Sequence, residues 1–226
     1  MNVLVNERLA AQSDRKKVFE ERAGRICDDL QHQGYSVQPS CLPAEILVAL
    51  QEQVRTLDAS EFFRAGIGRN TQHHTNDFVR SDKVCWMTGE TPTGKAWLDW
   101  AEALRVAINR RLFMGLFSFE SHYAWYQAGA YYKRHYDAFR GQTNRVLSVV
   151  VYLNSDWAAD DGGELVLYKD AQDRDGLRVT PLAGTLVVFL SEDFPHEVLP
   201  AKRDRFSIAG WYRVNASSSD TLDPPR

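Results

Sequence analysis

The sequence predicts an α+β fold in which helices in the first half of the chain support a β-rich second half. Up to about residue 113, apolar residues recur at three- and four-residue spacing, which is typical of amphipathic helices. After residue 117, short runs rich in β-branched and aromatic residues alternate with turn-forming clusters. Helices followed by many short strands favour an antiparallel sandwich or barrel with helices braced on one side.

Three helices are expected in the first half. The first covers 14–33, where Gly34 offers a C-terminal cap. A short strand over 35–37 precedes the second helix, which starts at Pro43 because proline suits the first turn. The third helix covers about 93–113. Their apolar faces are interpreted as core packing.

Six strands are expected in the second half, and a polar tail over 215–226 is expected to fray. The strands are 122–127, 131–135, 146–153, 164–168, 185–190 and 205–212. We expect one domain over 1–226, with helical support over about 14–116 and the β-rich core over about 117–214.

Composition narrows the classes of protein. The 226 residues are 44% hydrophobic and 12% aromatic, which is enough for a substantial core. A net charge of −3 provides no basic field for nucleic acid or an anionic membrane, so neither is expected as a partner. The three cysteines lack the spacing of a zinc site and are interpreted as reduced intracellular thiols. With no export signal or apolar span visible, a cytoplasmic monomer is expected.

Three residues indicate a metal site. His135 and Asp137 form a His-x-Asp pair at the end of an expected strand, and His196 follows much later. Residues i and i+2 of a strand point the same way, so the pair can converge on one ion. Two imidazoles and one carboxylate form the ligand set that holds non-haem Fe(II) and leaves other positions open.

Arg205 adds a second element of the same chemistry. It opens an alternating strand nine residues after His196. Its planar guanidinium matches a carboxylate better than a lysine would, and it is a natural partner for the remote carboxylate of 2-oxoglutarate. Ligands and arginine together predict an iron- and 2-oxoglutarate-dependent oxygenase.

The chain also resembles the prolyl hydroxylase domain family, which includes the animal hydroxylases of hypoxia-inducible factor. The resemblance covers about 24–214. It is carried by Val79-Arg80-Ser81-Asp82-Lys83-Val84-Cys85-Trp86, Tyr152-Leu153-Asn154-Ser155-Asp156-Trp157, Gly162-Gly163-Glu164-Leu165, Pro195-His196-Glu197-Val198, and Arg205 through Trp211-Tyr212. The resemblance implies a double-stranded β-helix (jelly roll) with supporting N-terminal helices.

The resemblance also implies cofactors and residue roles. Fe(II), 2-oxoglutarate and O2 would be required, with ascorbate as a candidate reductant. Cofactor-binding residues would be Arg205, Tyr152, Tyr126 and Trp211. Substrate-binding residues would be Arg145, Tyr132, Arg80 and Asp82. No side-chain acid or base is expected beyond the metal ligands.

The resemblance further implies a protein substrate. The short chain is similar to bacterial counterparts of the animal enzymes, for which the implied substrate is a prolyl residue of elongation factor Tu. A glycine-containing segment from about Phe62 to Val79 would cover that substrate during turnover.

Three alternatives remain open at this point. One is an oxygenase that hydroxylates a small molecule or a free amino acid. Another is a nucleic-acid demethylase of the same superfamily, although Ser207 stands where its Arg-x-Asn pattern has asparagine. The third is a non-catalytic metal-binding jelly roll.

Overall fold

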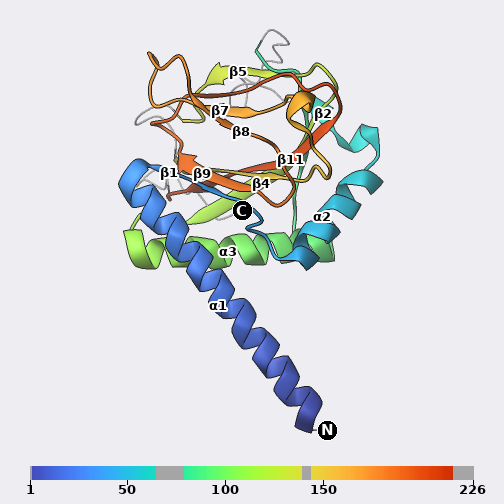
Figure 1. Ribbon diagram of the computed structural model, residues 1–226, viewed down its shortest axis with the longest axis vertical. Helices are drawn as coiled ribbons and strands as arrows, with labels where there is room; N and C mark the ends of the chain where they lie inside the picture. The colour runs from blue at the N-terminus through green and yellow to red at the C-terminus, as the bar shows by residue number, and fades with distance from the viewer. Residues whose placement is uncertain (1, 65–78, 139–143, 216–226) are drawn as a thin grey trace, which may run out of the picture.

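The computed structural model describes residues 2–64, 79–138 and 144–215, and it has three layers. In Figure 1, helices α1 and α3 lie below a larger sheet, and a smaller sheet lies above it. Both sheets are antiparallel. The predicted α+β class is therefore confirmed. The segment 65–78, which holds most of the expected substrate-covering segment, and the tail 216–226 lie outside the described residues.

The three helices begin and end close to the predicted residues, with one exception. They are α1 (Asn2–Gln33), α2 (Ala44–Thr56) and α3 (Pro92–Leu112). Gly34 ends α1 in the left-handed region, with φ at +79° and its N–H bonded to the Leu30 carbonyl. At the start of α3, the Thr91 hydroxyl accepts the Gly94 N–H at 3.0 Å.

The predicted start of the first helix, Asp14, is wrong. Helix α1 begins twelve residues earlier, at Asn2, and its first half projects away from the sheets in Figure 1. Residues 2–13 contain no glycine or proline and include strong helix formers such as alanine, leucine and arginine. The periodic apolar pattern used for the prediction marks only the part of a helix that packs, and propensity extends the helix beyond it.

The larger sheet has seven strands in the order β1-β9-β6-β11-β4-β3-β2 among the described residues. They are β1 (Tyr35–Gln38), β2 (Phe63–Arg64), β3 (Lys83–Trp86), β4 (Ser118–Tyr126), β6 (Arg145–Tyr152), β9 (Leu186–Leu190) and β11 (Arg205–Arg213). The smaller sheet has the order β5-β10-β7-β8. Its strands are β5 (Tyr132–His135), β7 (Leu165–Leu167), β8 (Leu177–Val179) and β10 (His196–Val198).

Four strands were not predicted: β2, β3, β8 and β10. Each has only two to four residues, which is too short to show an alternating pattern. Strand β10 is the consequential omission, because it carries His196 into the smaller sheet.

The larger sheet is covered on both faces, so it separates two cores. Strand β6 shows the division: Leu147, Val149 and Val151 pack against the helices, while Tyr152 joins the core between the sheets. Alternation along each strand therefore sends every second side chain into the space between the sheets. That space holds the candidate site described below.

Among the described helices, none combines the length and apolar character that crossing a bilayer requires.

Candidate active site

The three predicted metal ligands converge at one edge of the space between the sheets. Strands β5 and β10 pair with His135 opposite His196. His135 is the last residue of β5, and Asp137 follows it by two residues. The His-x-Asp pair therefore lies across the end of the strand. The Asp137 oxygens lie 3.5 Å from His135 Nε2 and 3.6 Å from His196 Nε2. One ligand atom from each residue lies within 4.8 Å of the other two.

The hydrogen bonds of the two rings orient their nitrogens. His135 Nδ1 lies 2.7 Å from the Lys133 carbonyl, and His196 Nδ1 lies 3.2 Å from the Phe194 carbonyl. A carbonyl can only accept, so each Nδ1 carries a hydrogen, and each Nε2 faces Asp137. This is the arrangement that metal-bound histidines adopt.

The third ligand is held as a carboxylate. Burial by itself raises the pKa of Asp137, but His196, His135 and the hydroxyl of Ser148 together hold that pKa well below its usual range. Burial lowers the pKa of His196 to about 4, so its ring is neutral near neutral pH. Two imidazoles and one carboxylate whose ligand atoms lie within 4.8 Å of one another fit Fe(II) and would leave coordination positions for other ligands.

Arg205 lies on the same interior space, at the start of β11. Its side chain is 1% exposed, its Nε donates to the Gly163 carbonyl at 2.8 Å, and one terminal nitrogen donates to Ser207 Oγ at 3.2 Å. Among the described residues, no carboxylate lies within ion-pair distance of this buried cation. A buried charge without a partner is costly, so the site is suited to an anionic ligand.

The backbone at Gly163 makes room for Arg205. Its φ of +73° is in the region that favours glycine, and an added Cβ would lie 2.9 Å from the Cβ of Ala201 and 3.2 Å from the Cδ of Arg205. Glycine at this position therefore allows its own carbonyl to hold the arginine.

Two tyrosines complete this end of the site. The Arg205 guanidinium carbon lies 4.9 Å from the ring centre of Tyr126 and 5.1 Å from that of Tyr152. The Tyr152 hydroxyl is buried and has no hydrogen-bond partner among the described residues. Burial raises its pKa to about 12, against the opposing charge of Arg205, so the hydroxyl stays protonated. A cation and an unpaired O–H donor together fit the far carboxylate of 2-oxoglutarate.

Arg80 and Asp82 form a buried ion pair that reaches the metal-ligand cluster through Tyr132. Their two hydrogen bonds measure 2.7 and 2.6 Å, and the Asp82 side chain is fully buried. Burial alone lowers the pKa of Arg80, but Asp82 raises it further than burial lowers it. The guanidinium stacks on Tyr132 at 4.4 Å, and that ring stacks on His135 at 3.5 Å. The ion pair therefore packs against Tyr132, which in turn packs against the ring of His135. Both charged side chains are much less exposed than those of a typical surface ion pair.

Arg145 and Trp211 lie at the other end of β11 from Arg205. The Arg145 guanidinium stacks on Trp211 at 3.6 Å, and Glu120 binds Arg145 at 3.0 Å and Arg213 at 3.2 Å. Trp211 is six residues from Arg205 along the same face, and its partner on β6 is Ser148. Of the expected cofactor residues, Tyr126 and Tyr152 therefore lie beside Arg205, whereas Trp211 lies nearer the metal-ligand cluster.

Sequence reasoning missed several residues of this space. Ser148 donates to Asp137, His122 packs between Trp86 and Trp211, and Gly163 holds Arg205. The signal for Ser148 was a polar residue inside an apolar strand over 146–151. His122 carried no such signal, because its importance depends on neighbours from other strands.

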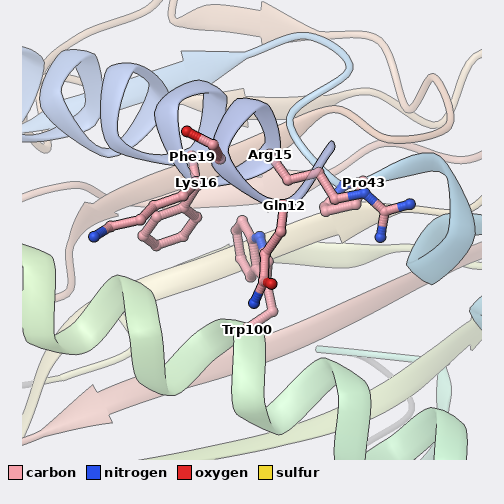
Figure 2. A pocket seen from close by; sticks show the side chains of 7 residues that line it. Gln12, Arg15, Lys16, Phe19, Pro43 and Trp100 are labelled. Carbon is pink, nitrogen blue, oxygen red and sulfur yellow. The ribbon is translucent and has the colours of Figure 1, made fainter. Parts of the chain in front are cut away.

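A hollow of about 660 Å³ lies elsewhere, between the middle of α1 and α3 on the helical side of the larger sheet (Figure 2). Phe19 and Trp100 line it, edge to face at 6.3 Å, together with Arg15 and Lys16. It contains no group of metal-ligating side chains, whereas the cluster between the sheets does. We therefore place the candidate active site between the sheets.

Comparisons with known proteins identify the family to which the chain belongs. The family model "2OG-Fe(II) oxygenase superfamily" matches residues 121–213, which include all three candidate ligands and Arg205. Human Egl nine homolog 1 is 28% identical over 79% of the chain. A hypoxia-inducible factor prolyl hydroxylase of Caenorhabditis elegans is 34% identical over 42% of it. The chain spans only 43% and 13% of these two relatives.

Solved structures extend the likeness over most of the chain. A Pseudomonas putida prolyl-4-hydroxylase is 40% identical, with a TM-score of 0.76 over 86% of this chain and 100% of that one. A Trichoplax adhaerens prolyl hydroxylase, solved with a hypoxia-inducible factor peptide, is 25% identical, with a TM-score of 0.77 over 88% of this chain and 92% of that one. These neighbours confirm the jelly-roll core. The chain belongs to the 2OG-Fe(II) oxygenase superfamily and is homologous to its prolyl hydroxylases.

Proposed function

We propose that this protein is an Fe(II)- and 2-oxoglutarate-dependent prolyl 4-hydroxylase that acts on a prolyl residue of a protein. The observation that carries the proposal is the pairing of two features in one space. His135, Asp137 and His196 present three ligand atoms within 4.8 Å, and the buried Arg205 has no carboxylate partner among the described residues. A metal and a dicarboxylate would satisfy both.

His135, Asp137 and His196 would hold Fe(II), and Arg205 with Tyr152 would bind the far carboxylate of 2-oxoglutarate. When bound there, Fe(II) with 2-oxoglutarate and O2 would supply oxidative decarboxylation and hydroxylation of an unactivated C–H bond. The protein supplies orientation: Gly163 fixes Arg205, and Tyr126 packs against the guanidinium. No further side chain is needed as an acid or base.

Arg145, Tyr132, Arg80 and Asp82 are the proposed substrate-binding residues. Tyr132 and Arg145 are partly exposed. Tyr132 stacks on His135, and Arg145 stacks on Trp211. Arg80 and Asp82 are less accessible. We propose that they act through Tyr132, because Arg80 stacks on the Tyr132 ring and Asp82 binds Arg80. Trp211 is proposed as a cofactor-binding residue that forms part of the pocket wall.

Elongation factor Tu is the candidate substrate, and it rests on the resemblance to bacterial counterparts of the animal enzymes. Ascorbate is the proposed reductant that keeps the metal ferrous. We also propose a cytoplasmic monomer. The free cysteines Cys27, Cys41 and Cys85 support this location, because cytosolic thiols stay reduced.

The test is hydroxylation of purified elongation factor Tu by the purified protein with Fe(II), 2-oxoglutarate and ascorbate. Mass spectrometry should find one added oxygen atom on a prolyl residue, with succinate formed in equal amount. Free proline and other amino acids, assayed in parallel, test the small-molecule alternative. Faster turnover of a free amino acid than of any protein would contradict the proposal.

A further inference from the structure

We propose that Ser148 and Ser191 are positioning residues that orient the Asp137 carboxylate for metal binding. This inference rests on the proposed metal site and adds two residues to it. Ser148 Oγ lies 2.6 Å from Asp137 Oδ2, and Ser191 Oγ lies 2.9 Å from Ser148 Oγ. The three groups form one hydrogen-bonded chain behind the candidate ligands.

The direction of this chain follows from the number of hydrogens available. A carboxylate oxygen only accepts, so the Ser148 hydroxyl, 2.6 Å from Asp137 Oδ2, must donate to it. Ser148 has a single hydroxyl hydrogen, so it can only accept from Ser191, which must donate. Each bond polarises the next, which strengthens the bond to Asp137.

The fold isolates this chain from solvent. Ser148 is 1% exposed on β6, and Ser191 is fully buried immediately after β9, the neighbouring strand. Among the described residues, their hydroxyls bond only to each other and to Asp137, and Ser148 lies between Trp211 and Phe189 of the neighbouring strands. Two buried hydroxyls in such a place would cost stability unless they bonded to something. Asp137 is the acceptor that compensates them.

The consequence is a carboxylate fixed in rotation. The bond from Ser148 holds Oδ2 3.6 Å from His196 Nε2, which leaves Oδ1 3.5 Å from His135 Nε2. Without the bond, the carboxylate would gain freedom about its Cβ–Cγ axis and would lose one compensating donor. Metal ligands oriented by outer partners typically lose about 10- to 100-fold in metal affinity when the partner is removed.

The experiment measures metal affinity in the metal-free protein, without turnover. Mn(II) is titrated into wild type, Ser148→Ala, Ser191→Ala and Ser148→Thr, and free Mn(II) is followed by electron paramagnetic resonance. We expect Kd to rise about 10- to 100-fold in Ser148→Ala. Ser191→Ala should give a smaller rise, and Ser148→Thr, which keeps the hydroxyl, should restore most of the affinity.

Ser121→Ala is the matched control. Ser121 is a serine of the larger sheet that is 1% exposed, but its hydroxyl accepts from Trp97 Nε1 on the helical side. Thermal unfolding of the metal-free variants shows that each is folded. An unchanged Kd in both Ser148→Ala and Ser191→Ala would overturn the inference, as would an equal loss in Ser121→Ala. Absence of Mn(II) binding in wild type would instead overturn the proposed metal site.

Discussion

Substitution of Arg205 by alanine should raise the KM for 2-oxoglutarate strongly while leaving the metal ligands in place. The guanidinium is 1% exposed and lacks a carboxylate partner among the described residues, so the co-substrate would supply its counter-charge. Removing one member of a buried, hydrogen-bonded charge pair costs about 2–5 kcal/mol. At about 1.4 kcal/mol per tenfold, KM should rise between about 30-fold and about 4,000-fold.

The assay is succinate formation at varied 2-oxoglutarate, with direct binding to the Mn(II)-loaded protein measured by calorimetry. Arg205→Lys should fall between wild type and Arg205→Ala, because an ammonium keeps the charge but not the planar fork. Arg203→Ala is the control. Arg203 is only two residues away, but it is 44% exposed and binds Asp161 at the surface. An unchanged KM in Arg205→Ala would show that another cation binds the co-substrate and would refute the reasoning.

Three further predictions concern the same space. Tyr152→Phe should raise the Kd for 2-oxoglutarate about 10- to 150-fold, because a hydrogen bond to a charged group contributes about 1.5–3 kcal/mol. The unfolding temperature of the ligand-free protein should not change. An unchanged Kd would show that the hydroxyl does not bind 2-oxoglutarate. Gly163→Ala should weaken 2-oxoglutarate binding by displacing Arg205. It should also lower the free energy of unfolding in denaturant by about 1–3 kcal/mol, because φ is +73°. Wild-type values of both quantities would contradict the close packing. His122 has a pKa of about 4, lowered mainly by burial and also by Arg80, against about 6.5 when unfolded. The stability that depends on neutral His122 is therefore fully present above pH 6.5, and the free energy of unfolding should fall by about 3 kcal/mol toward pH 4. In His122→Gln, the free energy of unfolding should change less with pH over that range. The same pH dependence in both proteins would show that His122 titrates normally.

Much of the fold could be predicted from local patterns. The helix that ends at Gly34 and the strand over Arg205–Arg213 follow from the spacing of apolar residues and from turn or cap residues within one short segment. Strand β10 could not be predicted this way. Its three residues follow Pro195 closely, and only pairing with β5 and β7 makes them a strand. Tertiary context decides such short elements.

The candidate site divides in the same way. His135, Asp137 and His196 could be proposed from sequence because their residue types have a specific chemistry at a known spacing. The supporting contacts could not, because they join distant segments. Ser148 reaches Asp137 from another strand, and Arg80 stacks on Tyr132 from a distant segment of the chain. Ordinary residue types acquire a role there only through position.

The most direct test of the central claim is a structure of the protein with Mn(II) and 2-oxoglutarate, prepared without oxygen. We expect one ion bound by His135 Nε2, His196 Nε2 and Asp137. We expect 2-oxoglutarate on the same ion, with its far carboxylate on Arg205 and the Tyr152 hydroxyl. An ion bound by other residues, or 2-oxoglutarate bound away from Arg205, would contradict the proposed site.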